Sequence, residues 1–304
     1  MNDVVLNHIR KTYNKDSLVA VDDVSFAVKK GELFGLIGPD GAGKSSIFRI
    51  LTTLLLPDGG NASVCGFDVV KEFKSIRNIV GYMPGKFSLY QDLTVEENLN
   101  FFATVFNTSV KENYDLIRDI YIQIEPFKDR RAGKLSGGMK QKLALCCALI
   151  HGPKILFLDE PTTGVDTVSR KEFWEMLKRL KAKGITILVS TPYMDEATLC
   201  EKIALMQTGK IMSIDTPQAV IQKFPEDLFA IKATHMSRLL KDLREFNGVK
   251  SCNSFGEYHH ITFLKKDENQ NDLLEFLKQK EHTNVTVKSI EPLIEDCFIN
   301  LMKN

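Results

Sequence analysis

The stretch GPDGAGKS, residues 38–45, constrains the fold of this chain more than any other feature. It continues the apolar run ELFGLI, which is typical of a buried strand, and runs into SIFRILTTLLL, which has the periodicity of a helix. Gly38, Gly41 and Gly43 let the backbone turn tightly and aim its N–H groups at phosphate oxygens, and the start of the helix adds partial positive charge. A glycine-rich turn without a ligand is the alternative, but this strand–loop–helix context favours a phosphate-binding loop.

A site for a nucleoside triphosphate also needs a cation for the phosphates and oxygen ligands for a metal. Lys44 is expected to reach the β- and γ-phosphates, and the hydroxyl of Ser45 to bind Mg²⁺. The apolar run ILFL ends in Asp159 and Glu160, at the strand end where open α/β sheets bind ligands. We expect Asp159 to hold the metal through its shell, and Glu160 to orient and deprotonate the attacking water, a role worth about 10²–10⁴-fold in rate. The acidic pair could instead cap a helix before Pro161.

The predicted nucleotide site around ATP and Mg²⁺ comprises Gly38, Asp40, Gly41, Ala42, Gly43, Lys44, Ser45 and Ser46 from the loop, with Asp159 as second metal ligand. Lys44 and Glu160 are the predicted catalytic residues.

The composition excludes several classes of protein. A net charge of +1 from 40 basic and 39 acidic residues leaves no electrostatic footprint for nucleic acid. No apolar stretch approaches the roughly 20 residues of a spanning helix, and the start of the chain lacks the apolar core of a signal peptide. Six cysteines show no CxxC spacing, which favours reduced, packed thiols in a cytoplasm. We therefore expect any membrane role to be that of a peripheral subunit.

Strand and helix patterns alternate along the first part of the chain. Residues 86–135 interrupt them with two stretches of helical periodicity, TVEENLNFFATVF and KENYDLIRDIYIQI, which we interpret as a helical insertion. The alternation resumes with KILFLDE, a helix from about Thr167 to Lys183, and ITILVS. This order predicts a mainly parallel sheet covered on both faces.

A second domain is predicted at residues 223–304, because the composition changes near Phe224 and Pro225. The patterns after this point follow a β-α-β-β-α-β order, typical of a small ferredoxin-like α+β domain, closed by the helix IEDCFINLMK. His259 and His260 lie in one predicted strand, where neighbouring side chains point to opposite faces, so ordinary surface and core positions are favoured over a metal site.

The stretch LSGGMKQKL, residues 135–143, resembles the signature of ATP-binding cassette (ABC) ATPases. The resemblance covers residues 3 to about 222. We therefore predict an ATP-binding domain at residues 1–222. It implies an α/β P-loop NTPase with an antiparallel β subdomain and a helical insertion. In this family Ser136, Gly137 and Gly138 would face the γ-phosphate bound by the other subunit of a head-to-tail dimer. A helix cap with flexible glycines is the alternative for this stretch.

Other positions are carried over from the family one at a time. Tyr13 matches the aromatic residue that stacks on adenine, although an exposed strand tyrosine is the alternative. Asp166 in TTGVD matches the aspartate that communicates across the dimer, with helix N-capping as its alternative. LYQDLTVEENL, residues 89–99, resembles the segment leading into the helical insertion that touches the membrane part of the transporter. The C-terminal domain looks like that of daunorubicin-resistance-type exporters, which implies export.

Two positions depart from the family pattern, and both belong to its reaction site. Gly85 in GYMPG stands where the family normally has a glutamine that helps coordinate metal and water. Pro192 in STPYMDEA stands where the family's switch histidine usually contacts the γ-phosphate. Losing one preorganised donor of this kind typically costs about 10²–10³-fold in rate. We therefore expect the chain's own site to bind ATP and to hydrolyse it poorly, unless both residues are simply tolerated.

The resulting hypothesis is an ATP-binding, ATP-hydrolysing subunit of an ABC exporter at the cytoplasmic face of the cell membrane. Its expected partners are membrane-spanning permease subunits and a second cassette, and no nucleic acid. An impaired site beside an intact signature favours pairing with a competent cassette, although a homodimer stays open. The alternatives are a regulatory subunit that binds ATP without hydrolysing it, and a soluble ABC ATPase of translation or DNA repair.

Overall fold

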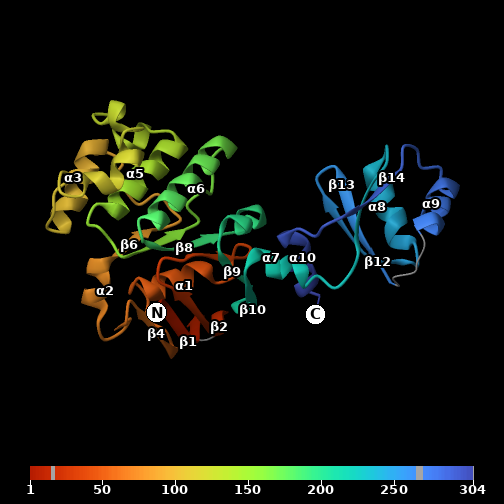
Figure 1. Cartoon of the computed structure of the whole chain (residues 1–304), viewed down its shortest axis with the longest axis horizontal. Coiled ribbons are helices and arrows are strands. Elements are labelled where there is room, and N and C mark those ends of the chain that lie inside the picture. The colour runs from red at the N-terminus through yellow and green to blue at the C-terminus, as the bar shows by residue number, and fades with distance from the viewer. Residues whose placement is uncertain (15–17, 265–269, 304) are drawn as a thin grey trace. The chain divides into compact units, whose positions relative to one another are not determined.

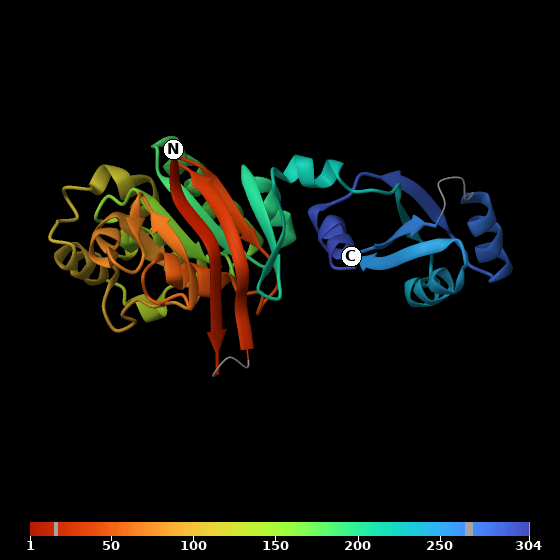
Figure 2. The same ribbon diagram turned by 90° about the horizontal axis from the view of Figure 1, so that it is seen from below.

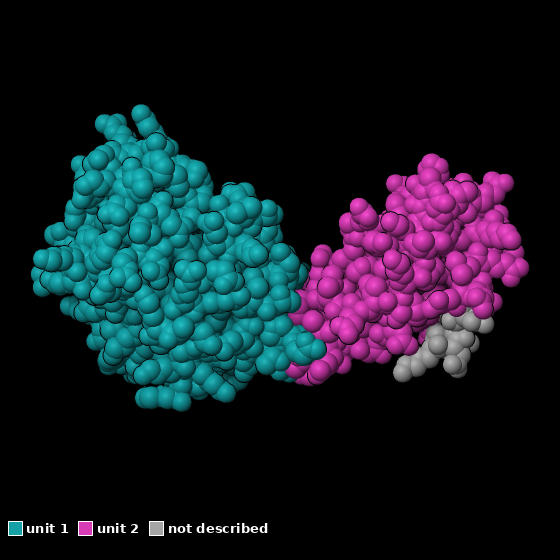
Figure 3. Space-filling model, turned by 45° about the horizontal axis from the view of Figure 1, so that its top comes forward, with its two compact units in different colours: residues 1–218 teal, residues 219–304 magenta. Residues whose placement is uncertain are grey.

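The computed structural model describes residues 1–14, 18–264 and 270–303. They divide into two units, Met1–Gln218 and Ala219–Asn304, coloured teal and magenta in Figure 3. Each unit has its own sheet or sheets and its own cluster of buried apolar side chains. Within the described residues, no helix is both long and apolar enough to cross a bilayer.

The first unit is built on a six-stranded sheet with the order β10-β9-β3-β8-β7-β6. Its strands are parallel except for β10 at the edge, which pairs with β9 in the antiparallel sense. All residues of the central strands β3, β7 and β8 are buried, as expected for a sheet covered on both faces. The six strands are β3 (Leu33–Ile37), β6 (Val80–Met83), β7 (Ile155–Asp159), β8 (Thr186–Thr191), β9 (Lys202–Gln207) and β10 (Lys210–Asp215).

Helices cover this sheet on both sides (Figure 1). Figure 1 shows α5 (Gly137–Leu149) and α6 (Thr167–Ala182) on one side of the central strands and α1 (Lys44–Leu51) on the other. The ring of Phe48 in α1 meets Phe157 of β7 edge to face, with 5.8 Å between ring centres. This contact fixes the helix that follows the phosphate-binding loop against the strand that carries the acidic pair.

A second sheet packs beyond α1 in the order β2-β1-β4-β5 and is entirely antiparallel. Its long strands β1 and β2 run side by side (Figure 2). The ring of Phe26 in β2 stacks on Phe34 of β3 at 5.3 Å, so the two sheets share one core. The strands are β1 (Asn2–Tyr13), β2 (Leu18–Lys29), β4 (Gly59–Val64) and β5 (Phe67–Asp68).

The predicted helical insertion is present between β6 and β7. It contains α3 (Val95–Val105) and α4 (Tyr114–Tyr121), followed by short 3₁₀ turns at Glu125–Phe127 and Ala132–Lys134. Thr94 and Glu97 form a capping box at the start of α3. Asn98 is fully buried, and its side-chain amide donates to the carbonyls of Tyr90 and Leu93 while its oxygen accepts the N–H of Tyr90. This one side chain therefore holds the preceding loop onto α3.

The second unit has the element order β-α-β-β-α-β followed by one helix. Its sheet has the order β12-β13-β11-β14 with every pair antiparallel. Apolar side chains of α8 and α9 share one core with β11, β12 and β13. The elements are β11 (Leu228–Lys232), α8 (Met236–Glu245), β12 (Val249–Phe255), β13 (Tyr258–Phe263), α9 (Gln270–Gln279), β14 (Thr286–Ile290) and α10 (Ile294–Leu301).

The expectation that one histidine of the pair in β13 lies at the surface is wrong, since both are buried. Their side chains do point to different partners. His259 contacts the carbonyl of Met236 in α8 at 2.8 Å, and His260 contacts the carboxylate of Asp296 in α10 at 2.8 Å. The sequence pattern treats the sheet as covered on one face, whereas α10 supplies a buried partner for the second histidine.

The helix after the phosphate-binding loop is shorter than SIFRILTTLLL predicts, because α1 ends at Leu51. The hydroxyl of Thr52 bonds back to the carbonyl of Phe48, and Thr53 adopts a left-handed backbone with φ +63°. Both features oppose continuation of the helix. The sequence patterns do not indicate the short helix α2 (Phe73–Ile79), which precedes β6. Another short helix, α7 (Pro217–Gln222), follows β10.

The end of β1, which carries Tyr13, is tied to the turn before β4 by Asp58. The Asp58 carboxylate accepts hydrogen bonds from Lys11 Nζ at 2.6 Å, Thr12 N–H at 2.7 Å and Thr12 Oγ1 at 2.8 Å. The bonds from Lys11 and then Thr12 lower the pKa of Asp58 from 3.8 to about 2. The stabilisation is therefore present at neutral pH and is lost as the pH falls from 3.8 towards 2.

We expect Asp58→Asn to lower the melting temperature at neutral pH, because the amide loses the charge that Lys11 pairs with. The difference from the wild type should shrink as the pH falls below about 4 and be lost once the pH is below the folded-state pKa. Thermal denaturation of both proteins across this pH range checks the prediction. A difference that stays constant with pH would show that the carboxylate charge is not responsible.

Candidate nucleotide-binding site

The phosphate-binding loop connects β3 to α1, and its glycines are required by close backbone contacts. A Cβ atom on Gly38 would lie 2.2 Å from the carbonyl oxygen of Met206, and one on Gly43 would lie 2.1 Å from that of Ala20. Gly41 and Gly43 also have positive φ values of 79° and 103°. The N–H of Gly38 donates to the carbonyl of Thr191 at 3.2 Å, which joins the loop to the end of β8. Side chains at these positions would displace the loop from the sheet.

The Lys44 side chain is 3% exposed and lies inside this loop. Its ammonium group donates to the carbonyl oxygens of Gly38 at 2.8 Å and Pro39 at 3.0 Å. The same nitrogen lies 3.1 Å from Oε1 of Glu160. A buried ammonium group requires such partners, because burying an unpaired charge is costly. The structure thus brings together the two residues predicted to be catalytic.

The acidic pair lies at the carboxyl end of β7, as predicted. Asp159 is 4% exposed, and its Oδ1 accepts a hydrogen bond from Ser190 Oγ at 2.5 Å. The N–H of Glu160 donates to both the hydroxyl and the carbonyl of Ser190, each at 3.0 Å. Glu160 has φ +50°, a left-handed conformation that costs of order 1–3 kcal/mol in a residue other than glycine. Ser190 holds this strained backbone in the position that points Glu160 towards Lys44.

The oxygen atoms at this edge suit Mg²⁺ better than a softer metal. No group of three or more His, Cys, Asp or Glu residues could hold a metal within the described part of the chain. Mg²⁺ is commonly held by one or two protein oxygens together with phosphate oxygens and water. The hydroxyl of Ser45 at the start of α1 and the carboxylate of Asp159 at the end of β7 are donors of that kind. The donor set therefore fits the metal that the sequence predicts.

Tyr13 lies at the end of β1, beside the phosphate-binding loop. Its hydroxyl lies 3.2 Å from Oγ of Ser46, the second residue of the loop's Ser-Ser pair. The Lys11 ammonium group lies 5.9 Å from the centre of the ring. This placement locates the aromatic ring next to the helix that follows the loop, and stacking on adenine stays a prediction.

The signature residues begin α5, next to the segment that carries Asp166. Ser136 caps this helix by accepting the N–H of Met139 at 3.3 Å. A Cβ on Gly138 would lie 2.7 Å from Oγ of Ser169, and one on Gly137 would lie 3.5 Å from the carbonyl of Gly164. The close approach explains Gly138 sterically, whereas the distance at Gly137 is an ordinary van der Waals contact.

Asp166 also acts as a helix cap, because its carboxylate accepts the N–H of Ser169 at 3.0 Å at the start of α6. That hydrogen bond lowers the pKa of Asp166. Both capping alternatives raised by the sequence are thus present in the structure. Ser136 and Asp166 thus begin two helices on adjoining segments.

The two positions that depart from the family pattern flank the acidic pair. A Cβ on Gly85 would lie 3.2 Å from the carbonyl oxygen of Asp159 and 3.8 Å from Cβ of Glu160. Pro192 follows Thr191, whose carbonyl accepts the N–H of Gly38. A side chain at position 85 would therefore adjoin the acidic pair, and position 192 directly follows the residue of β8 that bonds the phosphate-binding loop.

Ser190 was not among the residues predicted from sequence, although it contacts both members of the acidic pair. A usable signal was present, since two buried runs, ILFLD and TILVST, both end in polar residues. Asp159 and Ser190 are partners in the parallel register of β7 and β8. Recognising this contact requires knowing that the two runs are neighbours in the sheet.

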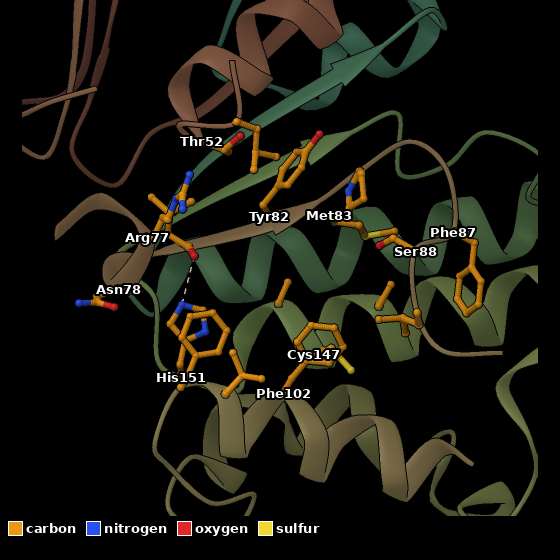
Figure 4. A pocket seen from close by; sticks show the side chains of 18 of the residues that line it. Thr52, Arg77, Asn78, Tyr82, Met83, Phe87, Ser88, Phe102, Cys147 and His151 are labelled. Atoms are coloured by element: carbon orange, nitrogen blue, oxygen red, sulfur yellow. Dashed lines mark hydrogen bonds between the residues drawn. The ribbon is translucent and has the colours of Figure 1, made fainter. Parts of the chain in front are cut away.

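A pocket of about 490 Å³ opens between the sheet and the helical insertion (Figure 4). Figure 4 shows Tyr82, Phe102 and His151 around it, and its lining is mostly apolar. His151 stacks on Phe106 with 3.8 Å between ring centres, and its Nε2 lies 3.2 Å from the carbonyl oxygen of Val80. Burial lowers the pKa of His151, so the ring is neutral at pH 7. The sequence patterns do not indicate this pocket.

Comparison with known proteins identifies the family of this site. The model of the family described as "ABC transporter" matches residues 21–163. The "Probable multidrug ABC transporter ATP-binding protein YbhF" of Escherichia coli is 38% identical over 309 residues, which cover 99% of this chain and 53% of that protein. The chain thus spans about half the length of that relative. The "Doxorubicin resistance ATP-binding protein DrrA" of Mycobacterium tuberculosis is 35% identical over 270 residues, covering 88% of this chain and 80% of DrrA.

The fold gives the same result. A bacterial ABC transporter cassette, solved as a dimer, superimposes with a TM-score of 0.64 at 26% identity, over 70% of this chain and 98% of the cassette. The predicted fold class is therefore confirmed, including the antiparallel β subdomain and the additional α+β sheet. On the strength of its phosphate-binding loop, its acidic strand end and these relatives, the chain belongs to the family of ABC transporter ATP-binding proteins.

Proposed function

We propose that this chain is the ATP-binding subunit of an ABC exporter, a peripheral subunit at the cytoplasmic face of the cell membrane. ATP binding would close two cassettes in a head-to-tail dimer, and hydrolysis would reopen them. The observation that carries the proposal is the buried Lys44 ammonium group, 3.1 Å from Glu160 and enclosed by the loop carbonyls. Export is supported by the names of the relatives, one a multidrug transporter protein and one a doxorubicin resistance protein.

Each residue of the site has a role in this proposal. Tyr13 would stack on adenine, and the N–H groups of the loop would bind the phosphate oxygens with Lys44. Ser45 and Asp159 would hold Mg²⁺, which neutralises phosphate charge when bound. Glu160, oriented by Ser190, would position the attacking water and take its proton.

The second cassette is needed because the signature of one chain would serve the phosphate-binding loop of the other. Ser136 and the N–H groups at the start of α5 form an anion site at a helix N-terminus. Asp166 begins the adjoining α6 and would communicate across the dimer. A dimeric relative with a similar fold supports this arrangement.

The chain's own ATP site is proposed to be impaired, and its partner to be a competent cassette. Gly85 adjoins the acidic pair and Pro192 follows the β8 residue that bonds the loop, yet neither offers a side-chain donor. Glycine and proline cannot replace the amide and imidazole groups that the family uses at these places. The same two positions favour the second candidate, a regulatory subunit that binds ATP without hydrolysing it. Both candidate functions require ATP binding, and they differ in whether ATP hydrolysis is also required.

The permease subunits are proposed to contact the pocket between the sheet and the helical insertion. The pocket adjoins the loop that contains Gly85, and Pro84, Phe87 and Leu89 line it. Its rim also exposes Leu54 and Val105, each with 59% of its surface accessible. An apolar pocket with exposed apolar side chains on its rim is typical of a protein interface.

Lys44→Ala should remove most ATP affinity. Truncating one partner of a buried, hydrogen-bonded charge costs about 2–5 kcal/mol, which is roughly 30-fold or more in Kd. Titration with a fluorescent ATP analogue measures the effect. Lys178→Ala, which removes an exposed lysine paired with Glu175 on α6, is the matched control and should bind normally. Unchanged binding in Lys44→Ala would refute the assignment of the loop.

Restoring both missing donors, with Gly85→Gln and Pro192→His together, should raise the ATP turnover of the isolated chain. One donor of this kind is worth about 10²–10³-fold in rate, so a gain of about tenfold or more is expected even if the new side chains fit imperfectly. The Gln at position 85 must displace the Asp159 carbonyl slightly, since its Cβ begins 3.2 Å away. Steady-state ATPase assays of the wild type and the double variant measure this gain in turnover rate. No gain would count against the impaired site and favour the alternative that Gly85 and Pro192 are simply tolerated.

Ser136→Ala should reduce hydrolysis at the partner's site more than at this chain's own site. The hydroxyl lies at the start of α5, where it would reach the triphosphate bound by the partner. A loss of about tenfold or more is expected in ATPase assays of this chain mixed with a competent second cassette. To measure the two sites one at a time, hydrolysis at the other site is blocked with Glu160→Gln in this chain or with the equivalent change in the partner. If the chain forms a homodimer and Ser136→Ala lowers the hydrolysis rate equally at its two identical sites, the proposed heterodimer is wrong.

A further inference from the structure

A buried carboxylate beside the ATP site has no part in the roles given above. Glu196 lies in the 3₁₀ turn Met194–Leu199 and is 2% exposed. Its Oε1 accepts hydrogen bonds from Thr162 Oγ1 at 2.8 Å and from Arg170 Nε at 3.1 Å. Its Oε2 accepts one from Thr191 Oγ1 at 2.6 Å. A carboxylate so deeply buried is retained only with donors of this number and strength.

Each donor belongs to a different segment of the proposed reaction site. Thr162 is two residues beyond Glu160, and Thr163 N–H donates to the carbonyl of Glu160 at 3.2 Å. Thr191 directly precedes Pro192, and its carbonyl accepts the N–H of Gly38 in the phosphate-binding loop. One carboxylate therefore connects the ends of β7 and β8, and β8 in turn contacts the loop.

The third donor leads to the segment proposed to face the partner. Arg170 lies in α6, and its N–H donates to the carbonyl of Asp166 at 2.9 Å. Its guanidinium group also lies 4.2 Å from the ring centre of Tyr193, directly after Pro192, and 3.2 Å from the exposed carboxylate of Asp195. Arg170 thus clamps the segment that contains Pro192 onto the first turns of α6.

The absence of a side-chain donor at position 192 increases the importance of this clamp. A histidine there would contact the γ-phosphate directly, whereas Pro192 leaves the segment connected to the loop through Thr191. From Thr191 the connected groups run through Glu196 to Arg170 and so to Asp166. Since charge-assisted bonds in a buried cluster resist separation, a shift of the loop would displace the whole cluster.

We propose that Glu196 is a positioning residue that transmits the binding of ATP from the phosphate-binding loop to the Asp166 segment. Glu196 contacts neither nucleotide nor partner and acts through Thr191, Thr162 and Arg170. The inference rests on the proposed function, because it requires that ATP binds to the loop and that Asp166 faces a second cassette.

Hydrogen–deuterium exchange of the full chain, with and without ATP and Mg²⁺, tests this inference. In the wild type, ATP should slow exchange both over residues 38–47 and over residues 161–172. In Glu196→Gln, which keeps the shape and removes the charge, slowing over 38–47 should remain and slowing over 161–172 should be lost. The matched control is Asp195→Asn, which removes the exposed carboxylate that contacts the same arginine and should respond like the wild type.

The response to ATP separates transmission from mere folding support, because a purely structural Glu196 would change exchange without ATP and leave the ATP-dependent difference over 161–172 intact. If Glu196→Gln does not fold, Thr191→Val and Thr162→Val each remove one hydroxyl donor at nearly constant volume and should each reduce that difference. If the ATP-dependent difference over residues 161–172 is undiminished in these variants, or in a folded Glu196→Gln, the inference is wrong and the proposed function is unaffected. A wild type without any ATP-dependent change over 38–47 overturns the proposed function and the inference with it.

Discussion

The position of the Lys44 ammonium group is the constraint on which the rest of the site depends. A buried cation has to be surrounded by oxygen atoms, and here these come from the loop backbone and from Glu160. The loop can supply its carbonyls only because Gly38 and Gly43 lie against neighbouring backbone without side chains. Glu160 can supply its carboxylate only because Ser190 holds its backbone at a positive φ. The cation, the glycines and the strained glutamate are therefore mutually dependent.

The location of the two departures from the family pattern follows from the order of the strands. The acidic pair ends β7, which lies between β6 and β8, and Gly85 and Pro192 follow those two neighbours. In the proposed function, the retained groups are those that would hold phosphates and metal, whereas the missing side chains are those that would approach the reacting phosphate from either flank. The proposed impairment is compatible with the binding geometry, since neither Gly85 nor Pro192 forms the hydrogen bonds and ion pair described for Lys44, Asp159 and Ser190.

The sequence alone was sufficient to predict those features whose residues lie close together in the chain. The phosphate-binding loop, the acidic strand end and the limits of α6 follow from residues that are close together in the chain. Prediction failed where the partner is distant: Ser190 contacts Asp159 across two strands, and the cluster around Glu196 joins residues 162, 170 and 191. The surface position expected for one of His259 and His260 failed for the same reason, because α10 covers the second face of the sheet. The early end of α1 at Leu51 is a local effect of the following threonines that the apolar run concealed.

The proposed impairment of the site is compatible with an intact signature, because the two depend on different parts of the fold. The phosphate-binding loop depends on β3, β8 and β9, through Thr191 and Met206. The signature depends on the packing of α5 against Gly164 and Ser169. Gly85 and Pro192 form none of these contacts, so the proposed loss of turnover does not require a change in the packing of Gly137 and Gly138. What connects the two regions is the Glu196 cluster, since Arg170 and Ser169 are neighbours in the first turns of α6. With the role proposed for Glu196, coupling between nucleotide and partner would depend on that cluster and not on the residue at position 192.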